Sequence, residues 1–295
     1  MIEFTSIQQM LEETSSSGLP LWDAIRQADC QRQGISPQQS WDKMAVMLQA
    51  MEDADRSYQE TDRSHSGLSG GDGGKMARYI RAGKPLCGPF LSDVMAGALR
   101  MGECNACMGR IVAAPTAGAS GVMPAVLLPV QKKYSLNDET MVQALYVAAG
   151  FGQVIATRAS ISGAEGGCQA EVGSASAMAA AALVHLRGGA PEQMAAACAM
   201  AIKNLLGLVC DPVAGLVEVP CVKRNVAGAV NALACADMAL AGICSAIPCD
   251  EVIDAMRSVG ESLPVSLRET GNGGLAATPT GRQIAEHMQS GKAVI

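Results

Sequence analysis

The sequence predicts a mainly α fold, a compact bundle of small-residue-rich helices whose glycine-rich loops converge on one site. Of the 295 residues, 49% are hydrophobic but only 3% are aromatic, and 32 are glycine. Such a core is expected to hold closely packed helices rather than an aromatic-filled sandwich. Alternating strand patterns are scarce, and neither a βαβ rhythm nor a sequence repeat is present.

The N-terminal part, residues 1–61, reads as polar amphipathic helices. Helices are predicted at residues 6–13, 21–31 and 37–59, and Ser36 is placed to cap the third. Residues 62–75, DRSHSGLSGGDGGK, are expected to form a polar loop because five of them are glycine. Residues 62–295 are assigned to a helical domain that is continuous with the N-terminal segment.

Helical periodicity continues through the rest of the chain. The predicted helices are residues 91–108, 122–133, 139–160, 174–187, 191–206, 222–247 and 249–262. The most apolar stretch, residues 226–247, is rich in Ala and Gly and contains Asn231 and Asp237. It is therefore interpreted as a buried helix rather than a membrane span.

Charge and cysteine content narrow the class of protein. The net charge of −6 argues against nucleic-acid binding, which normally needs clustered Lys and Arg. Eleven cysteines in a chain of this length, with no signal-peptide pattern at the start, indicate free thiols in a reducing cytoplasm rather than disulfides. Neither nucleic acid nor a membrane is an expected partner.

Three cysteines lie in glycine-rich or proline-flanked segments. Cys168 follows SISGAEGG, Cys210 begins CDPVAG, and Cys221 lies in VPCVKRN, with spacings of 42 and 11 residues. Thiolates are the usual ligands of iron-sulfur clusters, and three of them leave one iron open as a Lewis acid. We therefore expect an iron-sulfur site. In contrast, Cys198, Cys235 and Cys244 stand in Ala-rich stretches and are interpreted as core residues.

Other cofactor sites find less support in the sequence. A zinc site at the same three cysteines would lack the short ligand pairs typical of structural zinc. The Cys104 and Cys107 pair has no second such pair and no thioredoxin-like context. GGDGGKM fails as a phosphate loop, and neither a dinucleotide fingerprint nor a GxSxG hydrolase elbow is present.

Four loops rich in Gly, Ser, Thr and Asn connect the helices, at residues 114–121, 160–168, 210–225 and 269–281. Glycine-rich joints between closely packed helices need no function by themselves. Together with the three cysteines, however, they predict a site where the loops meet.

The segments PTAGASGVMPAV, SISGAEGGCQAEVG, GLVCDPVAGLVEVPCVKRN and RETGNGGLAATPTG resemble those of iron-sulfur-dependent L-serine dehydratases, in particular the separate alpha, or catalytic, subunit. The likeness runs from about residue 64 to residue 282. It implies a 4Fe-4S cluster on Cys168, Cys210 and Cys221, with no pyridoxal phosphate. No cysteine follows Cys249, so the resemblance implies a fourth iron open to water. It also implies a separate beta subunit. The apolar, weakly charged surface expected from the composition indicates self-association as well, with the first sixty residues as a candidate contact.

The implied reaction is elimination of water from L-serine, which gives pyruvate and ammonia. Its hydroxyl would bind the open iron while a base removes the α-proton. His65 is the candidate base because it lies in the polar loop at residues 62–75. The other histidines, His185 and His287, fall in predicted helices.

Further polar residues are candidates for binding and support. The candidate substrate-binding residues are Ser64, Ser66, Thr116 and Ser120. The last two lie in PTAGASG, which opens a helix whose N–H groups suit an anion. Glu165, Asn204 and Asn225 are expected to support the cluster segments from behind the ligands.

Two other functions remain open at this point. A cysteine desulfidase would bind a thiol on the same open iron and release sulfide. A cluster-based sensor would normally carry a DNA-binding or partner domain, and no basic recognition element is visible in the sequence.

Overall fold

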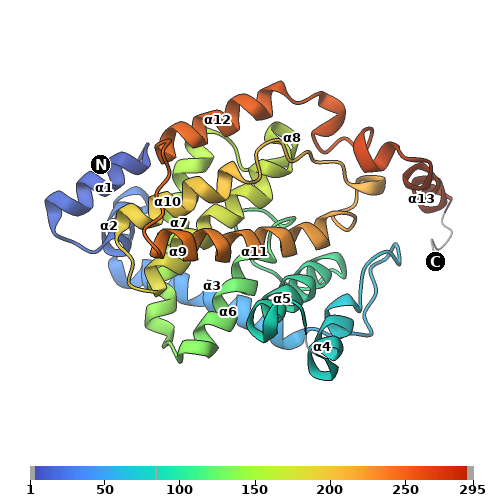
Figure 1. Ribbon diagram of the computed structural model, residues 1–295, viewed down its shortest axis with the longest axis horizontal. Helices are drawn as coiled ribbons and strands as arrows, with labels where there is room; N and C mark the ends of the chain where they lie inside the picture. Colours follow the sequence, from blue (N-terminus) through green and yellow to red (C-terminus); the bar gives the residue numbers. More distant parts are fainter. Residues whose placement is uncertain (1–3, 84, 291–295) are drawn as a thin grey trace.

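The computed structural model describes residues 4–83 and 85–290, and this part of the chain is mainly α-helical, as predicted (Figure 1). It contains thirteen α-helices and no strand within the described residues, apart from one isolated parallel bridge between Cys210 and Arg268. The molecule is elongated, with α1 (Ile7–Ser17) at one end and α13 (Pro279–Gln289) at the other.

The first three helices pack on the central part of the molecule. α2 (Leu21–Gln33) and α3 (Pro37–Ser57) both contact α7 (Asp138–Arg158). The predicted cap of α3 is confirmed, because the Ser36 hydroxyl accepts the Gln39 N–H at 3.2 Å and the Gln39 side chain accepts the Ser36 N–H at 2.9 Å. In the first turn of α3, the Ser40 hydroxyl hydrogen-bonds the buried Tyr146 hydroxyl of α7 at 2.8 Å.

The centre of the bundle is made by α7, α9 (Ser174–Leu186), α10 (Pro191–Lys203) and α11 (Cys221–Leu240). α9 is buried nearly all round, and its Ala179–Ala182 run has no exposed surface. Small side chains let the neighbouring backbones approach closely. At Gly228 of α11, an added Cβ would stand 2.7 Å from Val172 Cγ1 and 3.0 Å from Val122 Cγ2.

α4 (Asp72–Ala82), α5 (Gly88–Ala106) and α6 (Val122–Tyr134) form the lower side of the view in Figure 1. The prediction of a loop through residue 75 is wrong at its end, because α4 begins at Asp72. The cause is tertiary: the buried Glu103 carboxylate of α5 accepts the N–H groups of Asp72 at 2.7 Å and Gly73 at 3.1 Å. It therefore supplies the N-terminal cap that the local sequence lacks.

The C-terminal helices begin with α12 (Cys249–Ser262). α11 ends at Leu240, seven residues before the predicted end, and Gly242 adopts a left-handed φ of 87° beyond it. As a result Cys244 is exposed, so its assignment to the core is wrong, whereas Cys198 and Cys235 are buried as expected.

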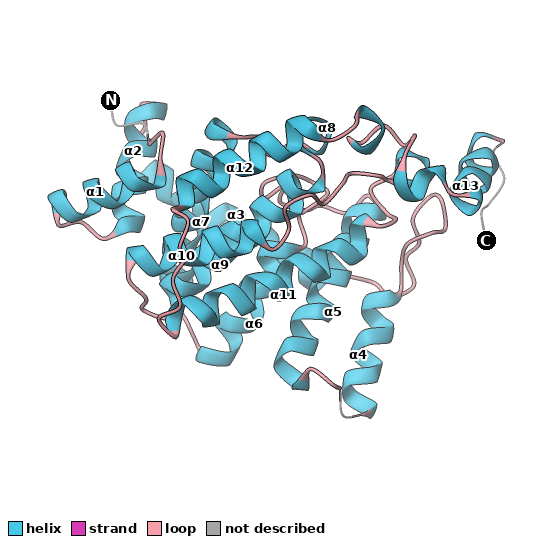
Figure 2. Ribbon diagram, turned by 45° about the horizontal axis from the view of Figure 1, so that its top comes forward, coloured by secondary structure: helices cyan, strands magenta, loops and turns pink. Residues whose placement is uncertain are grey.

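Short helical pieces lie near the predicted site. They are α8 (Gly163–Gly166), the π-helix η1 (Gln169–Gly173), and the 3-10 turns η2 (Val213–Gly215), η3 (Val265–Leu267) and η4 (Gly274–Ala277). Figure 2 shows loops gathering in the space between α8, α11 and α13. This is where the glycine-rich loops were predicted to meet.

Within the described part of the chain, one helix, α7, is long and apolar enough to span a membrane by length and composition. However, 67% of its most apolar window is buried inside the protein, where it contacts α2, α3 and α9.

Candidate functional site

Cys168 lies at the start of η1, directly after the α8 segment, and is 3% exposed. Three hydrogen bonds made by the next residue, Gln169, fix its position. The Gln169 N–H donates to the Leu208 carbonyl at 2.9 Å, its side-chain amide donates to the Met256 carbonyl at 2.9 Å, and its side-chain oxygen accepts the Gly207 N–H at 2.9 Å. The Cys168 segment is thereby tied to the chain that leads into Cys210.

Cys210 is likewise 3% exposed and pairs with the loop of residues 269–281. Its N–H donates to the Leu267 carbonyl at 2.8 Å, and its carbonyl accepts the Glu269 N–H at 2.8 Å. These two bonds make the isolated bridge with Arg268 and bring the ETGNGG segment next to the second cysteine.

Cys221 is the first residue of α11, and Asn225 links its helical turn to the loop of residues 114–121. The buried Asn225 amide donates to the carbonyls of Cys221 at 3.0 Å and Gly118 at 2.8 Å, and its oxygen accepts the Gly121 N–H at 2.9 Å. The predicted supporting role of Asn225 thus has a geometric basis.

Burial is the main influence on the ionisation of the three thiols. Burial raises the pKa of Cys168 to about 11 and that of Cys221 to about 12, and the Cys168 thiol contributes to the rise at Cys221. Burial, then Glu171 and Cys168, raise the pKa of Cys210 further. All three thiols are therefore held in their protonated form in the metal-free protein.

The three cysteines are not arranged to hold a single metal ion. In residues 4–83 and 85–290, no group of three His, Cys, Asp or Glu side chains is arranged to hold one metal ion.

Glu171, which the sequence did not single out, lies beside Cys210. The Cys210 Sγ is 3.9 Å from Glu171 Oε2. Burial raises the pKa of Glu171, and a hydrogen bond from Thr116 opposes that rise. The space around it depends on glycine: a Cβ at Gly163 would stand 2.8 Å from Glu171 Oε2 and 2.9 Å from Cys210 Sγ. The SISGAEGG and PTAGASG loops therefore meet at this carboxylate.

Arg224, in the first turn of α11, also binds the two residues that flank Cys210. Its guanidinium donates to the Val209 carbonyl at 2.7 Å and pairs with the buried Asp211 carboxylate at 2.8 Å. It partly opposes the effect of burial on the pKa of Cys168. Asp211 in turn accepts the Leu275 N–H at 2.8 Å, which ties the ETGNGGLAATPTG loop to the same group.

Ser64 and Ser66 are buried and both face Glu218, three residues before Cys221. Their hydroxyls donate to Glu218 Oε2 at 2.6 and 2.8 Å. His65, between them, is exposed. The structure therefore brings the loop of the candidate base to the Cys221 segment through a glutamate that the sequence did not identify.

The remaining predicted residues divide into two groups. Thr116 contacts Glu171, and the Ser120 hydroxyl in the same loop is buried without a hydrogen-bond partner among the described residues. In contrast, the contacts of Glu165 and Asn204 lie outside the cysteine group. Glu165 accepts the Ser160 hydroxyl at 2.6 Å, and the exposed Asn204 donates to Asn231 at 2.7 Å.

The Cys104 and Cys107 pair lies at the end of α5, where burial raises the pKa of both thiols. This environment disfavours the reactive thiolate form. The pair therefore shows no feature of a redox site.

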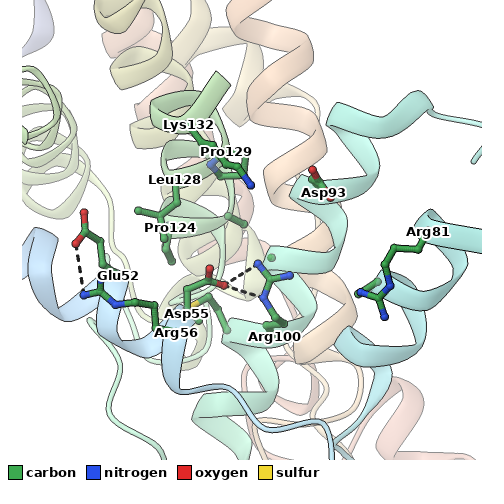
Figure 3. Close-up of a pocket in the computed structure, with 14 residues that line it drawn as sticks. Glu52, Asp55, Arg56, Arg81, Asp93, Arg100, Pro124, Leu128, Pro129 and Lys132 are labelled. Atoms are coloured by element: carbon green, nitrogen blue, oxygen red, sulfur yellow. Dashed lines mark hydrogen bonds and ion pairs between the residues drawn. The ribbon is translucent and has the colours of Figure 1, made fainter. Parts of the chain in front are cut away.

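A cavity of about 450 Å³ lies between α3, α4, α5 and α6, apart from the cysteines (Figure 3). The Asp55–Arg100 ion pair of 2.7 Å crosses it, and Arg81, Asp93 and Lys132 surround it with exposed charge. Neither the three cysteines nor His65 line it, so this cavity is separate from the candidate site.

Comparison with known proteins identifies the family. Residues 16–276 match the family described as serine dehydratase alpha chain. The chain belongs to the serine dehydratase alpha chain family. It is 51% identical over 288 residues to the probable L-serine dehydratase alpha chain of Bacillus subtilis (strain 168), covering 98% of this chain and 96% of that one. The L-serine dehydratase alpha chain of Peptoniphilus asaccharolyticus is 42% identical over 278 residues, with 94% and 95% coverage.

Longer relatives match only in part. L-serine dehydratase 2 of Escherichia coli (strain K12) is 46% identical over 181 residues, which are 61% of this chain and 40% of that protein. In this serine dehydratase alpha chain, all three cysteine segments lie inside the family match, as do Glu171, Glu218 and Arg224.

Proposed function

We propose that this chain is the catalytic chain of an L-serine dehydratase, a lyase that eliminates water from L-serine to give pyruvate and ammonia. The observation that carries the proposal is the convergence of Cys168, Cys210 and Cys221 with four polar loops, in a chain whose relatives are named L-serine dehydratases. An elimination of this kind needs a polarised leaving hydroxyl and a base for the α-proton.

The proposed cofactor is a 4Fe-4S cluster held by the three cysteines, without pyridoxal phosphate. When bound, such a cluster supplies a Lewis acid that makes hydroxide a better leaving group. The donor set supports it: three thiols, two of them 3% exposed, come from three separate segments. Arg224 stabilises negative charge beside Cys168, which favours the thiolate that a metal requires.

The proposed roles of the other residues follow from their positions. His65 accepts the α-proton at an imidazole nitrogen, since it is exposed at the tip of its loop. Thr116 and Ser120 hold the substrate, because the buried Ser120 hydroxyl still has an unused donor and acceptor. Asn225 keeps this substrate loop fixed to the first turn of α11.

In this proposal, Ser64 and Ser66 do not bind the substrate directly. Both of their hydroxyl hydrogens are directed to Glu218. Glu165 and Asn204 take part only indirectly, because their side chains bond to Ser160 and Asn231.

The proposed assembly includes a separate beta chain and a second copy of this chain, in the cytoplasm. We treat residues 62–295 as the catalytic unit and residues 1–61 as a helical segment packed on it. The alpha-chain names of the Bacillus and Peptoniphilus relatives support a beta partner.

The proposal is tested by substrate turnover after anaerobic purification. Faster release of pyruvate from L-serine than of sulfide from L-cysteine supports the dehydratase. The reverse order would instead identify a desulfidase on the same site. A protein that turns over neither substrate, while its cluster responds to oxygen or iron, would be a sensor.

A further inference from the structure

We propose that Glu218 is a positioning residue that holds His65 at a fixed place relative to the Cys221 end of α11. The inference rests on the proposed function in its catalytic part, since His65 is the proposed base. Its structural part, the holding of a loop by one buried carboxylate, stands on contacts alone.

His65 lies at the tip of a closed turn, defined here as residues 64–67 and called the His65 turn. The Gly67 N–H donates to the Ser64 carbonyl at 3.0 Å, and the Ser64 N–H donates to the Ser69 carbonyl at 2.9 Å. His65 is the second residue of this turn and is exposed, whereas Ser64 and Ser66 on either side are 5% and 2% exposed. The turn therefore points its serines inward and its histidine outward.

Each serine hydroxyl in the turn both donates and accepts a hydrogen bond within the protein. The Ser64 hydroxyl donates to Glu218 Oε2 and accepts the Ser69 N–H at 3.2 Å. The Ser66 hydroxyl donates to the same oxygen and accepts the Leu68 N–H at 3.0 Å. Among the described residues, the hydrogen bonds to the Glu218 carboxylate come from this turn alone.

Glu218 itself is fixed to the cysteine segment. It is 6% exposed, and its carbonyl accepts the Val222 N–H of the first turn of α11 at 3.0 Å. Its carboxylate thus connects the His65 turn to a cysteine-bearing helix that is more than 150 residues away in sequence. Without this carboxylate, two buried hydroxyls would lose their acceptor and the turn would lose its attachment.

The expected consequence is loss of turnover with little loss of substrate binding. A base displaced by about 1 Å can cost on the order of a hundredfold in rate. Substrate binding depends in our proposal on Thr116 and Ser120, in a loop that Asn225 holds independently. Glu218→Ala is therefore expected to lower kcat about 100-fold and to leave KM largely unchanged.

The experiment compares five variants of the full chain, assayed in the cluster-loaded form in which the wild type is active. They are Glu218→Ala, Glu218→Gln, His65→Ala, the double variant Glu218→Ala with His65→Ala, and the control Asp250→Asn. Asp250 is a matched control because its carboxylate also joins distant segments, accepting the N–H groups of Ile7 at 2.8 Å and Gln8 at 3.0 Å, but does so at α1.

Two results are expected from kinetics. Glu218→Gln retains most of kcat, because its amide oxygen can still accept both serine hydroxyls. The double variant is no slower than His65→Ala, because a residue that acts through another adds nothing once that residue is gone. Multiplied losses in the double variant, with iron content unchanged, would overturn the positioning role.

Amide hydrogen exchange gives a readout that needs no activity. Residues 62–71 should exchange faster in Glu218→Ala than in the wild type and in Asp250→Asn. Unchanged exchange would overturn the holding role. If the wild type makes no pyruvate from L-serine, the proposed function fails, while the exchange comparison still judges the role of Glu218.

Discussion

At the scale of single residues, each cysteine is held by a neighbour that reaches into another segment. Gln169 ties Cys168 to α12 and to residue 207, and Asn225 ties Cys221 to the loop of residues 114–121. The parallel bridge with Arg268 ties Cys210 to the segment that leads into the loop of residues 269–281. Hydrogen bonds between separate segments therefore help to set the position of all three thiols, and Cys221 is also held by the first turn of α11.

The first prediction concerns the cysteines. Changing Cys168, Cys210 or Cys221 to Ala should abolish the broad visible absorbance and the iron content of the anaerobically purified protein, because each removes one of three ligands. Cys198→Ala is the matched control: Cys198 is fully buried, in α10, and its replacement should leave iron bound. Full iron content in Cys210→Ala would contradict the assignment.

The second prediction concerns Asn225, whose side chain makes three hydrogen bonds while 1% exposed. Asn225→Ala leaves the Gly121 N–H and the Gly118 carbonyl without a partner. It should lower the free energy of unfolding by about 1 to 3 kcal/mol. Urea denaturation of the iron-free protein measures this, with Asn204→Ala as a control because Asn204 is exposed. Equal stability of the two variants would contradict the role given to Asn225.

The sequence could predict which residue types belong to the site but not all of their contacts. The loop settings of the three cysteines and of Asn225 were visible in the motifs. Glu171 and Glu218 were not singled out, because their partners Thr116, Ser64 and Ser66 lie far away in the chain. Only the fold shows that these carboxylates face buried hydroxyls and a thiol.

At the scale of elements, α11 is the helix that connects the site to the core. Its first turn carries Cys221, Arg224 and Asn225, and its middle packs against η1 and α6 through Gly228. The site therefore depends on a close helix contact that lies well behind the cysteines.

The third prediction tests this contact. Gly228→Ala places a methyl group against Val172 and Val122, whose branched side chains have few alternative rotamers. It should cost about 1 to 3 kcal/mol of stability. Gly83→Ala is the control, because the nearest atom to its Cβ would be the Tyr79 carbonyl oxygen at 3.4 Å. An unchanged midpoint temperature of unfolding in Gly228→Ala would contradict a close contact of α11 at this point.

Most helices could be predicted from periodicity and capping, and the exceptions have physical causes. α4 is not among the predicted helices, and its first residues fall in the predicted loop of residues 62–75, where Glu103 caps the helix from α5. The π-helix η1 after Cys168 has no periodic signal of its own, since its five residues are buried on most sides. Such pieces are frequent at functional sites, which agrees with its place beside a proposed ligand.

At the scale of the whole molecule, the proposed open iron makes the enzyme sensitive to oxygen. Air should remove activity and iron faster than it unfolds the helices, because α9 also packs directly on both α7 and α10. Activity, iron content and circular dichroism are followed together over time in air. Activity that survives prolonged aeration with the iron retained would contradict an open iron.

A second prediction at this scale concerns the partner chain. Co-expression with a beta chain should raise solubility or L-serine turnover and give a stable complex on size exclusion. The N-terminal helices α1, α2 and α3 are the proposed contact, so charge changes on their exposed residues should weaken the complex. An alpha chain whose elution and rate do not change on mixing would contradict the need for a partner.

The central claim is that a cluster on three cysteines makes this chain an L-serine dehydratase. The most direct measurement is pyruvate formation from L-serine before and after anaerobic reconstitution of the iron-free protein with iron and sulfide, without added pyridoxal phosphate. We predict that activity appears only after reconstitution, in proportion to bound cluster, and not in Cys210→Ala. Equal activity in the iron-free protein, or none in a fully loaded one supplied with its beta chain, would contradict the claim.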